Sequence, residues 1–340
     1  TSASASASGA AEQAFTALLA DPFQMLFWMV IICGIGFFIV GLGLQNGVER
    51  VTKVMMACLF VAIVILSINS VMLPGAHAGL EFYLMPDFGK MIENGFGDAV
   101  YAAMGQAFFT LSIGASGMAI FGSYIGRDRR LTGEAASVAG LSTLISLLAG
   151  LIIFPACFAY GVSPDSGPNL VFVTLPSVFD QMWGGQLWGT LFFVFMSFAA
   201  ISTLIAVFEA IMSFWMDQWS FSRNKAVAIN AILIPLLSLP CALGFNVWSG
   251  AELPGIGNIQ AIEDFVVSNN LLIVGSLVFT LFCVSKRGWG WKSFLQEVNT
   301  GDGMHFPKAL YYWVKFGIPV LIIVVLVSGW APLISSWLSG

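Results

Sequence analysis

The chain alternates between long apolar runs and short polar segments, a pattern typical of helices that cross a membrane repeatedly. A run of about 20 apolar residues can cross the roughly 30 Å hydrocarbon core of a bilayer. Runs of this length are Phe23–Leu44, Val51–Met72, Asp98–Ile125, Ala135–Tyr160, Leu187–Trp215, Ala226–Phe245, Phe265–Val284 and Val314–Leu333. The pattern therefore predicts an all-α polytopic membrane protein with eight transmembrane helices.

The third run is interrupted in its middle by small residues. Within Ala102–Tyr124, AAMGQAFFTLSIGASGMAIFGSY, the residues Gly114, Ser116 and Gly117 fall in four positions. Glycine costs about 1 kcal/mol in a helix interior relative to alanine, yet non-helical backbone at membrane depth is tolerated where it lines a cavity. We therefore expect an interruption at Ser112–Gly117 whose main-chain groups bind a small zwitterion or a cation, as in transporters with broken helices. A glycine-lined seam for helix packing is the alternative.

The fifth run carries a second polar group, within SFAAISTLIAVFE at residues 197–209. Ser202 and Thr203 lie near mid-membrane, and the carbonyl of Ala199 shares their face of the helix. Because alkali cations accept hydroxyl and carbonyl oxygens, this group predicts a sodium site. The alternative is that both hydroxyls bond to their own backbone or that both residues pack against a neighbouring helix. Glu209 is ionisable in an apolar run and is predicted to be paired or functional.

Composition supports a membrane protein and gives no sign of an enzyme. Of the 340 residues, 58% are hydrophobic and 9% are charged, and the mean hydropathy is +0.89. These values lie far outside the range of soluble proteins. No cluster of His, Cys, Asp and Glu has metal-ligand spacing, and no nucleophile adjoins a base. Nothing in the sequence predicts a nucleic-acid partner.

Charged residues predict the orientation of the spans. All of the 13 basic residues except Lys90 lie in alternate loops, which are cytoplasmic by the positive-inside rule. An even number of spans then places Thr1 and Gly340 outside. The low-complexity tract Thr1–Ala11 predicts a flexible extracellular loop over residues 1–22. Since no signal peptide precedes an outer chain end, we expect further helices upstream.

The outer loop Gly161–Gln186 combines prolines with an apolar stretch, Val171–Val178. This stretch is too short to cross the membrane and too apolar to be solvated. We expect it to fold into the extracellular mouth as a helical lid. A surface helix resting on the lipid headgroups is the alternative.

Four stretches carry a resemblance to a known family: GVERVTKVMM (47–56), GQAFFTLSIGASGMAIFGSY (105–124), GPNLVFVTLPSVF (167–179) and FAAISTLIAVFE (198–209). From about Phe23 onward the chain resembles the neurotransmitter:sodium symporter family, in particular its bacterial amino-acid transporters. The resemblance implies an inverted-repeat transporter fold whose fourth to eleventh helices are present and whose first three are absent. It implies a single transmembrane domain at residues 23–340, with the end of the first repeat at 23–73, the second at 98–285 and an extra helix at 309–336.

The resemblance also implies roles for single residues. The substrate would contact Phe109, Thr110, Ser112, Ala115, Thr203 and Val207. Sodium would be bound by Thr110, Ser142, Ala199, Ser202 and Thr203, although the family usually has asparagine where this chain has Ser142. Chloride would be bound by Gln106 and Ser146. The outer gate would use Asp264, and the cytoplasmic gate would use Tyr124 with Asp217. Ordinary packing is the alternative for Phe109 and Val207, and helix capping is the alternative for Asp264.

The resulting prediction is a sodium-coupled symporter of a bacterial cytoplasmic (inner) membrane that takes up a neutral amino acid by alternating access. Ala115 stands where relatives often have a bulky residue, so we expect a large hydrophobic or aromatic substrate. A proton-coupled transporter of the same architecture, supported by Glu209, and a non-transporting ligand-binding membrane module are the alternatives. The predicted partners are the amino acid and the lipid bilayer, and both a monomer and a homodimer remain open. Without the first three helices, we expect no transport by these 340 residues alone.

Overall fold

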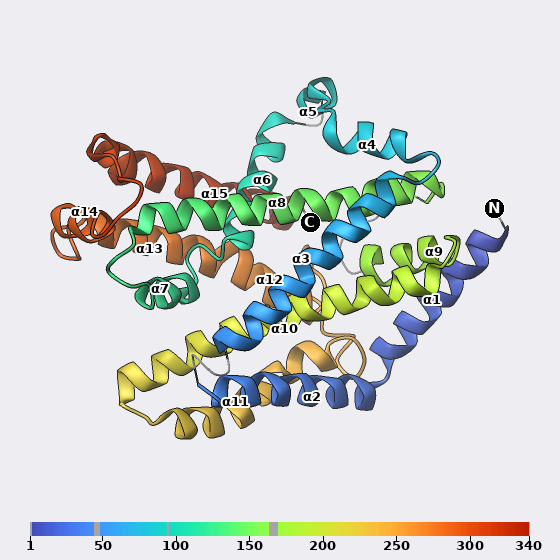
Figure 1. Cartoon of the computed structure of the whole chain (residues 1–340), viewed down its shortest axis with the longest axis horizontal. Coiled ribbons are helices and arrows are strands. Elements are labelled where there is room, and N and C mark those ends of the chain that lie inside the picture. The colour runs from blue at the N-terminus through green and yellow to red at the C-terminus, as the bar shows by residue number, and fades with distance from the viewer. Residues whose placement is uncertain (1, 44–47, 94, 163–168, 340) are drawn as a thin grey trace. The chain divides into compact units, whose positions relative to one another are not determined.

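A computed structural model of the chain describes residues 2–43, 48–93, 95–162 and 169–339. These residues are nearly all helical (Figure 1), which confirms the predicted all-α class. Seven of their helical segments are long and apolar enough to cross a membrane. The third predicted span is present as two shorter helices, α6 (Phe96–Thr110) and α7 (Ser116–Ser123). The eight predicted spans therefore all have helical counterparts.

The contacts of the chain group its residues into two compact units. Unit 1 comprises Thr1–Asp87 and Leu144–Trp248, and unit 2 comprises Phe88–Thr143 and Ser249–Gly340. The division falls inside one long helix, α8 (Leu131–Ala159). The predicted single domain, with repeat boundaries near residues 73, 98 and 285, stays a prediction.

Unit 1 is an assembly of helices in which the start of α2 follows from its local sequence. Its elements are α1 (Ser2–Ala20), α2 (Pro22–Gly41), α3 (Arg50–Val71), α4 (Ala76–Leu84), the second half of α8, η2 (Leu170–Thr174), α9 (Leu175–Phe179), α10 (Gly185–Trp219) and α11 (Arg223–Leu243). The Asp21 carboxylate accepts the main-chain N–H groups of Phe23 (2.9 Å) and Gln24 (3.1 Å), and Pro22 occupies the first turn. An acidic cap followed by proline is a strong start signal, so α2 begins here.

The core of unit 1 has two parts. In one, α3, α8, α9 and α10 pack around fully buried side chains such as Ile63 and Val178. In the other, α2 and α11 pack against α10, and the rings of Phe37 and Phe208 stack with centroids 4.1 Å apart. Burial of apolar side chains on both faces of α10 makes that helix the centre of the unit.

Helix α1 covers residues that the low-complexity pattern predicted to be a flexible loop, and here the structure differs from the prediction. Alanine is the best helix former, and the second half of α1 packs on η2 and α9. The ring of Phe15 stacks on that of Phe172 at 5.1 Å, and the Asn246 amide donates to the carbonyl of Leu19 (3.0 Å). Tertiary contacts of this kind are not visible in a serine and alanine repeat.

The predicted lid is helical, as η2 and α9. Leu175 and Val178 are fully buried in the core of unit 1, so the alternative of a surface helix resting on headgroups is wrong. Its predicted place at the extracellular mouth stays a prediction. Residues 163–168 of that loop, together with Leu44 at the predicted end of the first span, lie outside the described residues.

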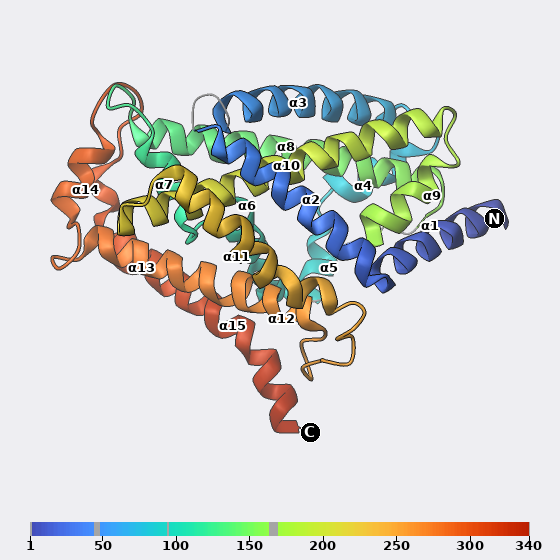
Figure 2. The same ribbon diagram turned by 90° about the horizontal axis from the view of Figure 1, so that it is seen from below.

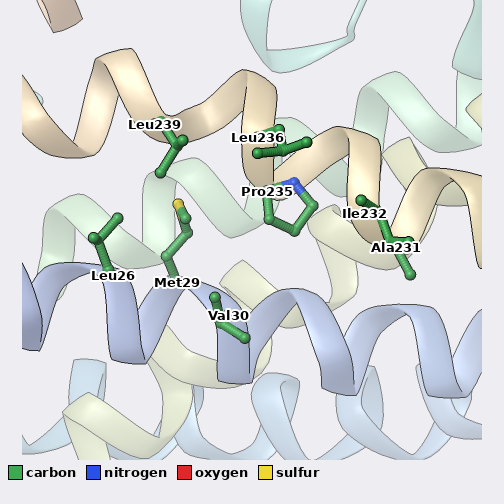
Figure 3. Close-up of a pocket in the computed structure, with 8 residues that line it drawn as sticks. All are labelled: Leu26, Met29, Val30, Ala231, Ile232, Pro235, Leu236 and Leu239. Atoms are coloured by element: carbon green, nitrogen blue, oxygen red, sulfur yellow. The ribbon is translucent and has the colours of Figure 1, made fainter.

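A proline inside α11 leaves room between two neighbouring helices. Pro235 has no N–H group, so it cannot donate the helical hydrogen bond to the carbonyl of Ala231. Between α11 and α2, at this turn, lies an apolar crevice of about 350 Å³ (Figure 3). Its wall on the α2 side is formed by Leu26, Met29 and Val30.

Unit 2 contains the broken helix and the C-terminal helices. Its elements are α5 (Phe88–Glu93), α6, α7, the first half of α8, α12 (Ile259–Val266), η3 (Val267–Leu271), α13 (Leu272–Val284), α14 (Trp291–Val298), η4 (Lys308–Leu310), η5 (Trp313–Gly317) and α15 (Ile318–Ser339). α13 and α15 run side by side (Figure 2). Ile273, Ile322 and Val325 form their buried core, and Met104 and Phe108 of α6 pack against it.

Two loops of unit 2 are tied together by main-chain hydrogen bonds. The loop after α7 meets the loop after α14, where the Arg130 N–H donates to the carbonyl of Asp302 (3.1 Å) and the Asp302 N–H donates to that of Asp128 (2.9 Å). The Arg130 guanidinium also donates to the carbonyls of Asn299 and Gly303. The loop that follows the broken helix is therefore anchored to the loop that follows α14.

Candidate functional site

The predicted interruption of the third span is present, and it lies slightly earlier than expected. α6 ends at Thr110 and α7 begins at Ser116, so Ser116 and Gly117 belong to α7. The chain turns at Ser112 (φ 48°) and Gly114 (φ 89°), two positions in the left-handed region. A left-handed residue cannot continue a right-handed helix, and this is why the break is centred on these two residues.

The first half of the break is a Schellman motif. The Ile113 N–H donates to the carbonyl of Phe108 and the Ser112 N–H donates to that of Phe109, both at 3.0 Å. Glycine usually occupies the left-handed position of this motif, and this chain has Ser112 there. The main-chain bonds found among the described residues leave the carbonyls of Thr110 and Leu111 without a donor. The break therefore presents main-chain oxygens that a cation or an ammonium group can bind.

The second half of the break lies against α13, and glycine is required on both sides of the contact. A Cβ atom on Gly114 would overlap the carbonyl oxygen of Leu272 and lie 2.7 Å from the Ser276 hydroxyl oxygen. A Cβ atom on Gly275 would overlap the carbonyl oxygen of Gly114. Sequence reasoning identified Gly114 but missed Gly275, because a single glycine in an apolar run does not reveal its partner.

Side chains around the break are largely uncovered within their unit. Phe109 is 57% exposed, and Thr110 and Ser112 are also exposed. The Gln106 side-chain amide donates to the Thr110 hydroxyl (3.2 Å). Phe109 does not belong to the buried core of unit 2. Packing in that core therefore does not explain why a phenylalanine occupies this position.

An apolar cavity of about 400 Å³ adjoins the break. The lining residues from the broken helix include Ala115 and Met118, and those from α8 and α13 include Val138 and Phe279. Ala115 has an extended backbone (φ −81°, ψ 142°) and precedes α7, whose first turn has no side-chain cap among the described residues. Small and apolar side chains at this point leave space for an apolar group.

Ser202 and Thr203 gather three oxygens at one point on α10. The Ser202 hydroxyl donates to the carbonyl of Ala199 at 2.9 Å, and the Thr203 hydroxyl donates to the same carbonyl at 3.0 Å. The hydroxyls therefore bond to their own helix, as the alternative expected, and this bonding holds the three predicted ligands together. Thr203 and Val207 are exposed within unit 1, whereas Phe208 and Glu209 are buried on the opposite side of the helix.

The structure thus describes the predicted site as two groups, each within its own unit. Unit 2 holds the group on the broken helix, and unit 1 holds the group on α10. The residues with a predicted role are Gln106, Phe109, Thr110, Ser112 and Ala115 in the first group and Ala199, Ser202, Thr203 and Val207 in the second.

Two further predicted ion ligands lie on α8. Ser142 is half-buried and Ser146 is exposed, one turn apart. The Tyr83 hydroxyl of α4 donates to the main-chain carbonyl of Ser146 at 3.4 Å. Partial burial raises the pKa of the Tyr83 phenol above its ordinary value, so Tyr83 stays a protonated donor. Sequence reasoning did not associate Tyr83 with this position.

The predicted gate residues occupy helix ends and exposed turns. Asp264 is exposed, and its carboxylate accepts a hydrogen bond from the Ser268 hydroxyl (2.7 Å). Asn258 caps α12 through the N–H of Ala261 (3.0 Å), so the alternative that Asp264 caps its helix is wrong. Tyr124 is the C-cap residue of α7, and Asp217 lies in the last turn of α10. Their pairing stays a prediction.

The structure identifies the partner of Glu209, which sequence reasoning did not find. Glu209 is fully buried, and its two carboxylate oxygens accept hydrogen bonds from the Arg223 guanidinium at 2.7 and 2.8 Å. Arg223 also donates to the carbonyl of Val40 (2.9 Å). The pair therefore joins α10, α11 and α2. Arg223 was read only as a basic loop residue, because the turn at Ser220 that brings it back is not evident in the sequence.

Comparison with known proteins gives consistent relatives. Residues 17–336 match the family described as the sodium:neurotransmitter symporter family. The chain is 35% identical over 332 residues to the uncharacterized sodium-dependent transporter YhdH of Bacillus subtilis, a match that covers 96% of this chain and 72% of YhdH. It is 31% identical over 315 residues to an uncharacterized sodium-dependent transporter of Haemophilus influenzae, with 91% of this chain and 66% of that protein covered.

A solved structure agrees with these matches. The fold is similar to that of MhsT in complex with L-phenylalanine, with a TM-score of 0.81 and 35% sequence identity. The similarity covers 93% of this chain and 70% of MhsT. The chain thus spans between 66% and 72% of the length of these three relatives.

Proposed function

The chain belongs to the sodium:neurotransmitter symporter family, and from this premise we propose that it carries a neutral amino acid with a large hydrophobic or aromatic side chain across a bacterial inner membrane together with sodium. Its named relatives are sodium-dependent transporters and not enzymes. It is an integral membrane protein, and no bond of the substrate is made or broken. Alternating access is the mechanism, because a polar zwitterion cannot cross a bilayer without a cavity that opens to each side in turn.

The break between α6 and α7 is the observation that carries this proposal. An amino acid has a carboxylate and an ammonium group, and the ends of two half-helices offer N–H and C=O groups to both. The carbonyls of Thr110 and Leu111 bind the ammonium group, and the start of α7 faces the carboxylate. Phe109 and Ser112 on the break, with Thr203 and Val207 on α10, contact the rest of the substrate.

The size of the substrate follows from the small residue at the break. Ala115 adjoins an apolar cavity of about 400 Å³, and a bulky side chain at this position would fill part of that space. The related MhsT has been solved with L-phenylalanine. Both observations support an aromatic or large aliphatic amino acid rather than glycine or alanine.

Sodium is a co-transported substrate in this proposal. One ion binds to the carbonyl of Ala199 and the hydroxyls of Ser202 and Thr203, and a second binds to Thr110 and Ser142. Hydroxyl and carbonyl oxygens suit a hard monovalent cation. Sodium and amino acid together stabilise the closed arrangement, because each binds it more tightly than the open ones, and this shifts the population between outward and inward states.

Glu209, the residue on which the proton-coupled alternative depends, has a structural partner that supports sodium coupling instead. The Arg223 guanidinium binds both carboxylate oxygens of Glu209, and Glu209 is fully buried. A group that carries protons must instead exchange them with water in each cycle. The ion pair therefore serves the packing of unit 1.

Uptake by the full-length protein in proteoliposomes tests the proposal. An inward sodium gradient should concentrate radiolabelled L-phenylalanine, and unlabelled leucine or tryptophan should compete better than glycine. Removing both hydroxyls with Ser202→Ala and Thr203→Ala should lower the apparent sodium affinity by about tenfold or more, since each lost ligand bond is worth about 1 kcal/mol. Ser238→Ala is the matched control, because Ser238 bonds in the same way to its own helix at Ile234.

Two results would contradict the proposal. Accumulation driven equally well by a proton gradient without sodium would support the proton-coupled alternative. Binding of L-phenylalanine without any accumulation would support a non-transporting membrane module.

A further inference from the structure

The segment that follows the predicted outer gate residue is not an ordinary α-helix. Between α12 and α13 the chain forms one wide π-helical turn, η3, at Val267–Leu271. In this turn the Asn270 side-chain amide donates to the carbonyl of Phe265, five residues earlier, at 3.0 Å. Such turns are rare, interrupt the regular hydrogen bonds of a helix and often occur at functional sites. A stable π turn in a membrane helix needs a partner for its polar groups.

Trp330 of α15 supplies that partner. Its indole N–H donates to the Asn270 side-chain oxygen at 2.8 Å. The Asn270 side chain thus donates through its nitrogen to Phe265 and accepts through its oxygen from Trp330. The Trp330 ring also meets the Phe265 ring edge-on, with centroids 5.3 Å apart and planes at 74°. Trp330 therefore contacts the π turn twice, once through a hydrogen bond and once through an aromatic pair.

The carboxylate of Asp264 is held by the same turn. Asp264 directly precedes Phe265, and the Ser268 hydroxyl within η3 donates to the Asp264 carboxylate at 2.7 Å. A π turn contains more residues than an α turn. Compared with a regular α-helix, it therefore changes the rotation of the following residues about the helix axis relative to Asp264. Asp264 lies in the last turn of α12, directly before the π turn, and hydrogen bonds of Asn270 with Phe265 and Trp330 hold the π turn.

α15 also touches the first half of the broken helix, one residue before Trp330. A Cβ atom on Gly329 would lie 2.5 Å from the Tyr101 hydroxyl oxygen of α6. Nearer the start of α15, Ile322 and Val325 form a buried cluster with Ile273. Met104 and Phe108 of α6 pack against this cluster. Gly329 and Trp330 therefore place α15 in contact with both α6 and η3.

We propose that Asn270 and Trp330 form a latch, in which a helix outside the broken-helix site positions the outer gate residue Asp264 relative to α6. Asn270 and Trp330 are positioning residues, because they act on Asp264 through the π turn. This inference rests on the proposed function for the gate role of Asp264, whereas the latch itself is a property of unit 2.

Trp330→Phe and Asn270→Ala test the latch in the full-length protein. Trp330→Phe keeps an aromatic ring on Phe265 but removes the indole N–H, and Asn270→Ala removes the other partner. Asn269→Ala is a matched control, because the neighbouring asparagine makes no side-chain hydrogen bond among the described residues. Trp313→Phe controls for the loss of an exposed tryptophan in the same transmembrane segment.

The first measurement is hydrogen exchange of the main-chain amides of residues 259–275 in detergent or nanodiscs. Loss of one hydrogen bond should speed exchange of this segment by about three- to tenfold in either variant, with the two controls unchanged. Because both variants remove the same bond, the double variant should exchange no faster than the faster single one. Unchanged exchange in Trp330→Phe and Asn270→Ala would overturn the latch.

The second measurement separates positioning from general stability. A misplaced Asp264 should raise the KM for external L-phenylalanine several-fold, with little change in the maximal uptake rate. Simple destabilisation would instead lower the folded fraction, and with it the maximal uptake rate per total protein, at constant KM. Faster exchange with an unchanged KM would overturn the positioning role. Absence of uptake by the unmodified protein would count against the proposed function, while the exchange measurement would still decide the latch.

Discussion

At the scale of single residues, Arg223 and Glu209 form the contact on which the packing of unit 1 most clearly depends. A carboxylate inside a membrane helix is unfavourable unless it is paired, and both oxygens of Glu209 are bound by one guanidinium. Arg223 reaches it from the first residue of α11, where the Ser222 hydroxyl accepts the N–H of Lys225 (3.4 Å). The same guanidinium binds the carbonyl of Val40 at the end of α2.

Arg223→Ala should lower the free energy of unfolding by about 3–5 kcal/mol, because it leaves the buried Glu209 carboxylate without its charged partner. Arg223→Lys should be intermediate, since an ammonium group cannot bind both oxygens as a planar fork. The control is Arg129→Ala, which breaks the exposed pair with Glu134 and should cost about 1 kcal/mol or less. Denaturant unfolding of the purified protein measures the free energy of unfolding of all three variants. Equal losses of this free energy in Arg223→Ala and Arg129→Ala would contradict the expectation.

At the scale of elements, the broken helix depends on α13 as much as on its own sequence. Gly114 and Gly275 allow the backbone of the break to approach that of α13, and the Ser276 hydroxyl next to them donates to the carbonyl of Leu272 (2.7 Å). A glycine-lined packing seam and a broken helix were alternative readings of the third span. Both descriptions apply, because the packing of Gly114 against α13 occurs within the break itself.

Gly114→Ala should destabilise the protein by about 2–5 kcal/mol, through left-handed strain of a non-glycine residue and overlap of its methyl group with Leu272. Gly117→Ala, three residues later, is the matched control. A Cβ atom there has no neighbour within 4 Å among the described residues, and Gly117 lies in α7, so alanine should be neutral or slightly stabilising. Thermal unfolding of both variants measures the difference, and a tolerated Gly114→Ala would show that the contact with α13 is not required.

At the scale of the whole molecule, the proposed mechanism raises the question of charge balance. Two sodium ions bound with a zwitterion, as proposed, would bring net positive charge into the site, and a bound anion would offset part of it. Gln106 and Ser146 are the residues proposed for chloride. Gln106 already donates to Thr110, a predicted sodium ligand, and Ser146 carries no charge of its own.

Uptake by the full-length protein should therefore fall several-fold when chloride is replaced by gluconate at constant sodium. Ser146→Glu should restore uptake in gluconate, because a carboxylate supplies the negative charge that chloride would bring. Ser197→Ala, which removes a hydroxyl bonded to its own helix at Phe193, should leave the chloride response unchanged. Initial uptake rates in the two salts check this, and equal rates for the unmodified protein would remove the chloride site from the proposal.

The sequence by itself determined the class of the protein, because a helix must present an apolar run of about 20 residues to cross a bilayer. It also located the break near Gly114, since small residues in such a run carry a known conformational cost. It predicted that Ser202 and Thr203 share a face with Ala199, which the two hydrogen bonds to that carbonyl confirm.

Only the tertiary structure decided which distant residues meet. Gly275 approaches Gly114, Arg223 pairs with Glu209, Trp330 bonds to Asn270, and Phe15 of α1 stacks on Phe172. Each of these contacts joins segments that a periodic pattern describes separately. Periodicity reports which side of a helix is apolar, whereas the identity of the neighbour on that side depends on how the whole chain packs.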